Sequence, residues 1–259
     1  FVARGLIPNN ERSYKNLGTV IADAREVGLI DWDAIVDRTR FLRRQAHWAS
    51  PQDIVGACAA QFRIDKWANQ PKYVEVWIEK DALIGVIEGV CKENDVPYLA
   101  CRGYASASEV WSAGHNRLKC AIDNYKECHV LYLGDHDPSG IDMTRDVEER
   151  LRRYAEADDE QITVSRLALN MDQVDEYQPP PNPTKMTDSR AGWYVETYGD
   201  ECGELDALDP VVIRDLIDES IKGHRDNKQW STDCATEEKA REDLKKVADK
   251  WESIVKKLK

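Results

Sequence analysis

The chain has 259 residues, of which 42% are hydrophobic and 32% are charged, a balance typical of a globular protein with a buried core. No stretch approaches the roughly 18 to 20 consecutive apolar residues of a membrane span, and the first residues lack the features of a signal peptide. We therefore expect a cytoplasmic protein, compatible with nucleoid association and without membrane contact. The net charge of −12 argues against a protein that coats nucleic acid with its whole surface, but it leaves room for a local basic groove near Arg38, Arg40, Arg43 and Arg44.

The seven cysteines are scattered, with no Cys-x-x-Cys pair and no histidine at zinc-ligand spacing. We expect reduced, mostly buried thiols. The absence of zinc-ribbon ligands from the sequence also argues against a primase.

Residues 1–70 are expected to form a helical region, with a partial winged helix as one interpretation. A helix over 13–27 is predicted to begin at a Ser13 cap and to end at Gly28, and a second helix over 51–69 to begin at Ser50. The apolar or small residues at helical spacing in the first helix are Tyr14, Leu17, Val20, Ile21 and Ala24. A helix followed by a glycine and a short apolar segment suits a winged-helix DNA-binding unit, but any helical hairpin gives the same pattern.

Residues 71–177 predict an α/β core. Strands are expected over 73–78, 96–101, 129–134 and 162–169, separated by helices over 82–93, 106–124 and 138–155. This alternation implies a parallel sheet with helices on both faces. Such sheets place their chemistry beyond the carboxyl ends of the strands.

Residues 178–259 are expected to be a linker followed by a C-terminal helical extension. Four prolines between 178 and 190 remove backbone donors, so this segment is predicted to be a loop. A terminal helix is predicted from about Glu237, with an apolar stripe that either packs on the same core or forms a partner-binding coiled coil.

Two predicted strands end in acidic residues. The strand over 73–78 runs into Glu79, and the strand over 129–134 runs into Asp135-His136-Asp137. If these strands are parallel neighbours, Glu79, Asp135 and Asp137 meet at one edge of the sheet. Two carboxylates about 4 Å apart repel by roughly 4 kcal/mol at an effective dielectric near 20, so such a group needs a cation. An all-oxygen site with few protein ligands suits Mg²⁺, with Mn²⁺ as a substitute.

Two other interpretations account for part of this pattern. Asp137 before Pro138 is typical of a helix start, where the carboxylate caps the helix, and different oxygens of one carboxylate can serve both roles. A cap alone leaves Glu79 and Asp135 unexplained. Haloacid-dehalogenase phosphatases also carry Asp-x-Asp after a strand, but they place Thr or Val two residues after the second Asp, where this chain has Ser139.

A strand before Glu79 and a strand before Asp135-x-Asp137, within one βαβαβ unit, resemble the Toprim domain of topoisomerases, primases and related nucleases. The sequence over 134–142 is most similar to the A subunit of topoisomerase VI and its meiotic recombination relatives. Segment 76–82 resembles their first acidic motif, Arg102-Gly103-Tyr104 their basic turn after the second strand, and 203–208 a Glu-rich segment after the sheet. The similarity spans roughly residues 73–209.

The resemblance implies that Glu79, Asp135 and Asp137 are metal ligands and catalytic residues, with Glu79 also able to act as a general acid or base. It implies that Lys80 and Arg102 contact nucleic-acid phosphates, as the reaction motivates, although a surface salt bridge is the alternative for Arg102. DNA is the implied partner, and a homodimer is suggested by analogy. An ATPase partner subunit is a further possibility, since the sequence has no Gly-x-x-x-x-Gly-Lys-Ser/Thr loop.

The chain departs from the topoisomerase pattern in its nucleophile. Those enzymes attack DNA with a tyrosine on a winged-helix domain that precedes the Toprim domain. The sequence over 1–7 resembles the segment just after the helix that carries this tyrosine, so we expect the matching residue upstream of Phe1 and the chain to be a fragment. Tyr14 lies on an apolar stripe typical of a core and is not expected to be the nucleophile.

The sequence supports two hypotheses. The first is a Mg²⁺-dependent DNA-processing enzyme, either a Toprim nuclease or a fragment of a topoisomerase-VI-A-like DNA-cleaving protein. The second is a non-catalytic Toprim-fold module for DNA binding or regulation. Metal-dependent nicking that requires Glu79 would separate them.

Overall fold

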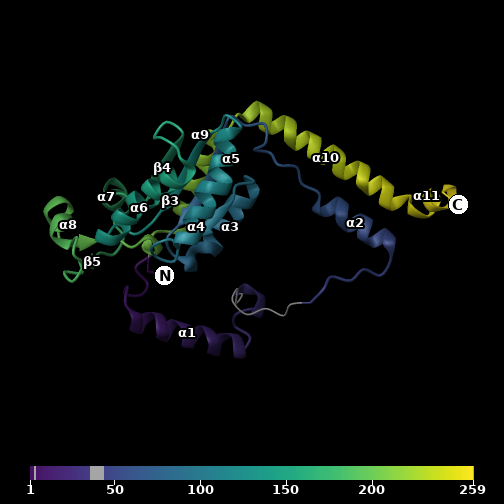
Figure 1. Cartoon of the computed structure of the whole chain (residues 1–259). Coiled ribbons are helices and arrows are strands. Elements are labelled where there is room, and N and C mark those ends of the chain that lie inside the picture. Colours follow the sequence, from purple (N-terminus) through teal and green to yellow (C-terminus); the bar gives the residue numbers. More distant parts are fainter. Residues whose placement is uncertain (3, 36–43, 259) are drawn as a thin grey trace. The chain divides into compact units, whose positions relative to one another are not determined.

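The computed structural model describes residues 1–2, 4–35 and 44–258 (Figure 1). The chain divides into two compact units, one formed by Phe1–Leu6 and Asp65–Trp230 and the other by Ile7–Ile64 and Ser231–Lys259. Arg38, Arg40 and Arg43 of the predicted basic groove lie outside the described residues.

A four-stranded parallel sheet forms the centre of the first unit. Its strands are β1 (Lys72–Ile78), β2 (Tyr98–Ala100), β3 (Glu127–Leu133) and β4 (Ile162–Ala168), in the order β2-β1-β3-β4. β1 and β3 pair in parallel along their whole length, from Lys72 opposite Glu127 to Ile78 opposite Leu133. The prediction of a parallel sheet is thereby confirmed, and the two acid-bearing strands are neighbours.

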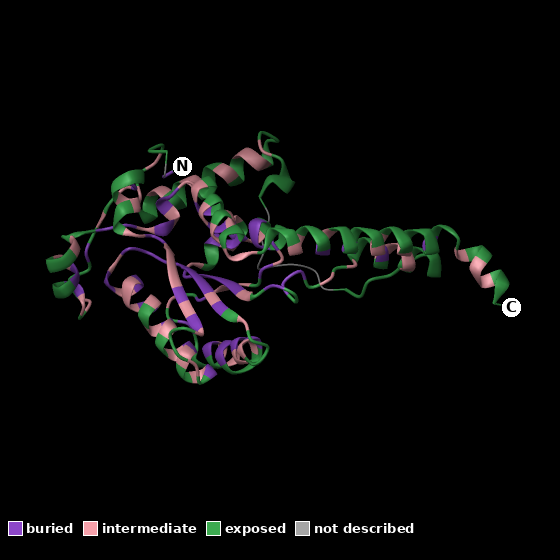
Figure 2. Ribbon diagram, turned by 90° about the horizontal axis from the view of Figure 1, so that it is seen from above, coloured by how far each residue is buried: buried purple, intermediate pink, exposed green. Residues whose placement is uncertain are grey.

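Helices cover both faces of this sheet (Figure 1). On one face, α3 (Ile84–Glu93) and α9 (Pro210–His224) pack through Ile87 and Ile217 against Val76 and Ile78. The opposite face carries α4 (Ala107–Ser112), the π-helical turn η3 (Ala113–Leu118), α5 (Lys119–Asp123) and α6 (Pro138–Ala155). Neighbouring strand residues point to opposite faces, which is why Trp77 belongs to the second cluster. In Figure 2 the strands are mostly buried and the helices expose their outer sides.

The predicted helix over 138–155 is confirmed as α6, while the one over 106–124 is interrupted by η3. A Cβ atom on Gly114 would lie 2.8 Å from Cβ of Tyr154 on α6, so this turn approaches α6 more closely than a side chain allows. The short turn η2 (Asp81–Leu83) precedes α3 within the predicted helix over 82–93.

The segment after β4 contributes to the same unit. It contains α7 (Met171–Tyr177), α8 (Ala191–Tyr198), the turn η4 (Leu205–Ala207) and α9. Strands β5 (Asn182–Pro183) and β6 (Glu201–Cys202) pair antiparallel, so the predicted loop over 178–190 holds one short strand. Ile213, Ile217 and Ile221 of α9 are fully buried against the sheet.

The second unit contains α1 (Glu11–Glu26), η1 (Trp32–Ala34), α2 (Pro51–Gln61) and α11 (Trp251–Lys257), with most of α10 (Asn227–Asp249). Asn10 caps α1 by accepting from the Ser13 backbone N–H, so the predicted Ser13 cap is wrong. The predicted core position of Tyr14 is also wrong, because its side chain is 43% exposed. The Ser50 cap of α2 is confirmed, although α2 ends well before residue 69.

The terminal helix α10 begins well before the predicted start near Glu237. Within the second unit, buried Glu237 accepts from the Ile64 backbone N–H at 3.0 Å and pairs with Arg241 at 2.7 Å. Arg241 in turn donates to the Phe62 carbonyl at 2.9 Å. Among the described helices, none is long and apolar enough to span a bilayer.

Candidate functional site

Glu79 and Asp135 meet at the carboxyl edge of the sheet. The Glu79 backbone N–H donates to the Leu133 carbonyl at 2.8 Å, which continues the β1–β3 pairing by one residue. The Asp135 backbone N–H then donates to Glu79 Oε2 at 3.0 Å. Only 9% of Glu79 and 7% of Asp135 is exposed. Parallel pairing therefore brings together two acidic residues that lie 56 positions apart in the sequence.

Burial perturbs both carboxyl groups. Burial, with the negative charge of Asp135 as the next cause, raises the pKa of Glu79 from 4.5 to about 7. Burial also raises the pKa of Asp135, against the opposing influence of Lys80. Near neutral pH, the Glu79 carboxyl is therefore poised between its protonated and ionised forms, as a general acid or base requires.

Lys80 lies among three carboxylates. Its Nζ is 3.0 Å from Oδ2 of Asp135, 2.9 Å from Oδ1 of Asp206 and 3.3 Å from Oε2 of Glu204. Burial alone would lower the pKa of Lys80, but the acidic neighbours outweigh it and the pKa is raised. Glu79 and Asp135, at the carboxyl ends of β1 and β3, form what we call the acidic edge. The Lys80 ammonium supplies part of the positive charge that this edge needs. The other Asp135 oxygen, Oδ1, accepts from the Leu205 backbone N–H at 2.8 Å.

Asp137 caps α6, as the sequence predicts. Its Oδ1 accepts from the Gly140 backbone N–H at 2.6 Å and from the Ser139 hydroxyl at 2.9 Å. Both bonds use one oxygen, so the cap itself leaves Oδ2 for another role. Gly140 is required in this turn because a Cβ atom there would lie 2.2 Å from the Asp135 carbonyl oxygen.

Arg166, which the sequence analysis missed, holds the loop that carries both aspartates. From β4 its guanidinium donates to the carbonyls of Gly134, Asp135, Gly140 and Leu169, and its Nη1 also donates to the Thr144 hydroxyl at 2.7 Å. Burial lowers the pKa of Arg166, while nearby acidic groups including Glu79 oppose the shift. Arg166 is the one charged residue of the predicted strand over 162–169, and this was the signal that could have identified it.

Arg102 reaches the site through its backbone. Its N–H donates to the Glu79 carbonyl at 2.9 Å, whereas its side chain is 74% exposed and pairs with Asp81 at 3.2 Å. This geometry matches the surface salt bridge considered as the alternative. A role for Arg102 in phosphate contact remains a prediction.

The donor chemistry of Glu79, Asp135 and Asp137 fits a hard cation such as Mg²⁺, because all three offer carboxylate oxygens and two of them are buried together. Their arrangement is not a closed metal cage: across residues 1–2, 4–35 and 44–258, no group of three or more His, Cys, Asp or Glu converges to hold an ion. Lys80 instead contacts an oxygen of Asp135.

No protein-family model matches the chain, and searches of curated proteins and of solved structures likewise gave no match. The functional proposal therefore rests on the geometry of the acidic edge, together with the Toprim resemblance of the sequence.

Proposed function

We propose that this chain is a Toprim-type protein, similar to the topoisomerase VI A subunit, that acts on the phosphodiester backbone of DNA with Mg²⁺. The observation that carries the proposal is the contact between Glu79 and Asp135 at the carboxyl edge of neighbouring parallel strands. Parallel sheets place catalytic groups at this edge. Two buried acidic groups there, one with its pKa raised to about 7, favour a site that receives a cation.

In this proposal Glu79, Asp135 and the free oxygen of Asp137 hold the metal, for which Mn²⁺ could substitute. A bound divalent ion supplies charge stabilisation at the reacting phosphate. Glu79 exchanges a proton with the leaving or attacking oxygen, a role that its raised pKa supports. Lys80 and Arg102 contact phosphate oxygens, and Arg166 positions the aspartate loop through backbone carbonyls.

The wider assembly in this proposal is based on the resemblance. DNA is the substrate, and the helical region before β1 contributes a partial winged helix that binds it. A homodimer, an ATPase partner subunit and a nucleophilic tyrosine that is not assigned to a residue of this chain complete the topoisomerase-like version. A self-sufficient nuclease needs none of these additions.

A non-catalytic Toprim-fold module is the second candidate. One observation favours it: Lys80 contacts Asp135, Glu204 and Asp206, so part of the acidic edge is neutralised without a metal. In that case the fold would bind DNA or a regulator, and the acidic edge would stabilise the domain.

The deciding experiment incubates the purified chain with supercoiled plasmid and Mg²⁺ or Mn²⁺, beside the Glu79→Gln and Asp135→Asn variants. Nicking by the parent that both variants lose supports the self-sufficient nuclease. Nicking that persists in both variants overturns the assignment of the acidic edge. An inactive parent that binds Mg²⁺ through Asp135 favours the topoisomerase-like version, which requires a tyrosine nucleophile or a partner. An inactive parent without Mg²⁺ binding favours the non-catalytic module.

A further inference from the structure

Lys80 joins the acidic edge to a turn that follows the sheet. Its Nζ lies 3.0 Å from Asp135 Oδ2, 2.9 Å from Asp206 Oδ1 and 3.3 Å from Glu204 Oε2. The other oxygen of Asp135, Oδ1, accepts from the Leu205 backbone N–H at 2.8 Å. Both oxygens of Asp135 therefore have a partner in the protein, although the proposed function assigns this carboxylate to a metal ion.

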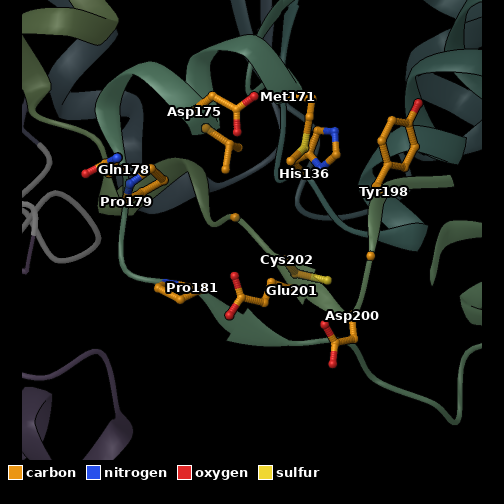
Figure 3. A pocket seen from close by; sticks show the side chains of 13 residues that line it. His136, Met171, Asp175, Gln178, Pro179, Pro181, Tyr198, Asp200, Glu201 and Cys202 are labelled. Atoms are coloured by element: carbon orange, nitrogen blue, oxygen red, sulfur yellow. The ribbon is translucent and has the colours of Figure 1, made fainter. Parts of the chain in front are cut away.

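A short bridge fixes the chain just before Glu204. His136 and Gly203 exchange backbone hydrogen bonds at 2.8 and 3.0 Å. Figure 3 shows His136 beside a cavity of about 380 Å³, which Gly203 also lines. Glu204 and Asp206 do not line this cavity, and their carboxylates meet Lys80 instead. The turn therefore offers the ammonium a fixed second place beside Asp135.

The Lys80 side chain is free to shift between these partners. It is 24% exposed, so solvent reaches it, and lysine carries its charge on a flexible four-carbon stem. An ammonium that leaves Asp135 keeps the carboxylates of Glu204 and Asp206, so its charge stays paired. A cation at Asp135 favours this shift, because two positive charges that share one carboxylate repel each other.

We propose that Lys80 couples metal binding to DNA binding at the acidic edge, an inference that rests on the proposed function. With neither ligand bound, Lys80 contacts Asp135. A DNA phosphate at the edge attracts the ammonium away from Asp135, which leaves this carboxylate to a metal ion. When Asp135 holds a metal ion, Lys80 is released toward the phosphate. Both ligands favour the same position of Lys80, so each raises the affinity for the other by the same factor.

This role differs from that of a simple phosphate contact. A lysine that only contacts phosphate raises the affinity for DNA equally with and without metal. A lysine that also contacts Asp135 lowers the affinity for metal until DNA is bound. Direct contact between a metal ion and a phosphate adds coupling as well, but it does so with or without Lys80. The contribution of Lys80 is therefore the part of the coupling that its substitution removes.

The test measures the binding of a short fluorescein-labelled DNA duplex to the full chain by anisotropy, in EDTA and in saturating Mg²⁺ at matched ionic strength. The coupling factor is the dissociation constant in EDTA divided by that in Mg²⁺. Lys80→Gln should weaken DNA binding and lower the coupling factor by about fivefold or more. The matched control is Lys92→Gln, which removes a mostly exposed lysine paired with Glu88 and should keep the coupling factor of the parent.

Two results of this test would overturn the inference in different ways. Equal coupling factors in the parent and Lys80→Gln, together with Mg²⁺ binding through Asp135, would contradict the coupling role alone and leave the proposed function standing. A parent that binds no Mg²⁺, or no duplex in either buffer, would contradict the proposed function and the coupling role together.

A second measurement uses the parent alone and decides the matter if Lys80→Gln fails to fold. Acetylation of lysines, read by mass spectrometry, reports how accessible each amine is. Saturating Mg²⁺ without DNA should raise the acetylation of Lys80 relative to that of Lys92, because the Lys80 ammonium loses its contact with Asp135. Unchanged acetylation of Lys80 while Mg²⁺ is bound through Asp135 would show that the ammonium stays in place, and would overturn the inference.

Discussion

Asp137 uses one oxygen for structure, and our proposal assigns the other to the metal. Asn caps helices about as well as Asp, so Asp137→Asn should retain the start of α6 while removing the charge. We predict a change in unfolding free energy within about 0.5 kcal/mol for Asp137→Asn, against a loss of about 1 kcal/mol for Asp137→Ala. Mg²⁺ affinity should fall by about tenfold or more in both variants. Urea denaturation and a Mg²⁺ titration measure the two effects, and unchanged Mg²⁺ affinity in Asp137→Asn would show that Asp137 is a cap only.

Lys80 and a metal ion compete for Asp135, since Nζ is 3.0 Å from Asp135 Oδ2. Lys80→Gln should lower the melting temperature of the metal-free protein by several degrees, because it leaves buried acidic groups without their cation. Mg²⁺ should then raise the melting temperature of this variant more than that of the parent. Differential scanning fluorimetry with and without Mg²⁺ measures both shifts.

The matched control for this test is Lys92→Gln, which removes a mostly exposed lysine that pairs with Glu88 on α3. It should change neither the metal-free melting temperature nor the response to Mg²⁺. A smaller Mg²⁺ response in Lys80→Gln than in the parent would contradict competition and assign Lys80 to the metal-bound site.

Among the elements, β1 carries a buried ion pair on the face opposite α9. Glu75 is 2% exposed and accepts from Arg117 Nε of the π-helical turn at 2.8 Å, from the Tyr73 hydroxyl at 2.8 Å and from Trp77 Nε1 at 2.8 Å. Arg117→Met should destabilise the fold by about 3 kcal/mol, because Glu75 keeps its place in the core without its cation. Chemical denaturation measures the change. Arg145→Met on the exposed face of α6 should cost far less than Arg117→Met, and equal losses would contradict a structural role for the buried pair.

Local patterns predicted the elements that depend on local chemistry. The strands over 73–78 and 129–134 are recognisable as β-rich apolar runs, and Pro138 after Asp137 marks the start of α6. The interruption at η3 escaped prediction because it depends on the close approach of Gly114 to Tyr154 of α6. The packing of α9 on the sheet escaped it as well, since contacts with residues more than a hundred positions earlier decide that face.

The same division applies to the site. Glu79, Asp135 and Asp137 were predicted together because parallel strand ends meet at one edge. The contacts of Lys80 with Glu204 and Asp206 join residues 124 and 126 positions apart, and no spacing rule encodes them. Arg166 likewise binds backbone carbonyls, which have no sequence signature.

At the scale of the whole molecule, the acidic edge links stability to pH. The pKa of Glu79 is raised from 4.5 to about 7 on folding, so the folded state favours the protonated carboxyl. This contribution is fully present below about pH 4.5 and is lost as pH rises through 7, by an amount on the order of 3 kcal/mol. Glu79→Gln should remove this pH dependence in metal-free buffer, and Mg²⁺ should offset it in the parent. Denaturation curves at about pH 5 and about pH 8 make the comparison.

Without metal, the parent should lose more stability than Glu79→Gln when the pH rises from about 5 to about 8. An equal or smaller loss in the parent would contradict the raised pKa of Glu79. His224 gives an opposite dependence that both proteins share. Its pKa is lowered to about 4 by burial and by the neighbouring His129, so its contribution is present above its unfolded value and is lost as pH falls through about 4. The difference between parent and variant therefore isolates Glu79.

The central claim is that the acidic edge binds a divalent cation, and calorimetric titration of Mg²⁺ into the parent and the Asp135→Asn variant tests it most directly. Our account predicts saturable Mg²⁺ binding by the parent and its loss in the variant, because Asp135 contacts both Glu79 and Lys80 at this edge. Equal Mg²⁺ binding by the two proteins, or none by the parent, would contradict it.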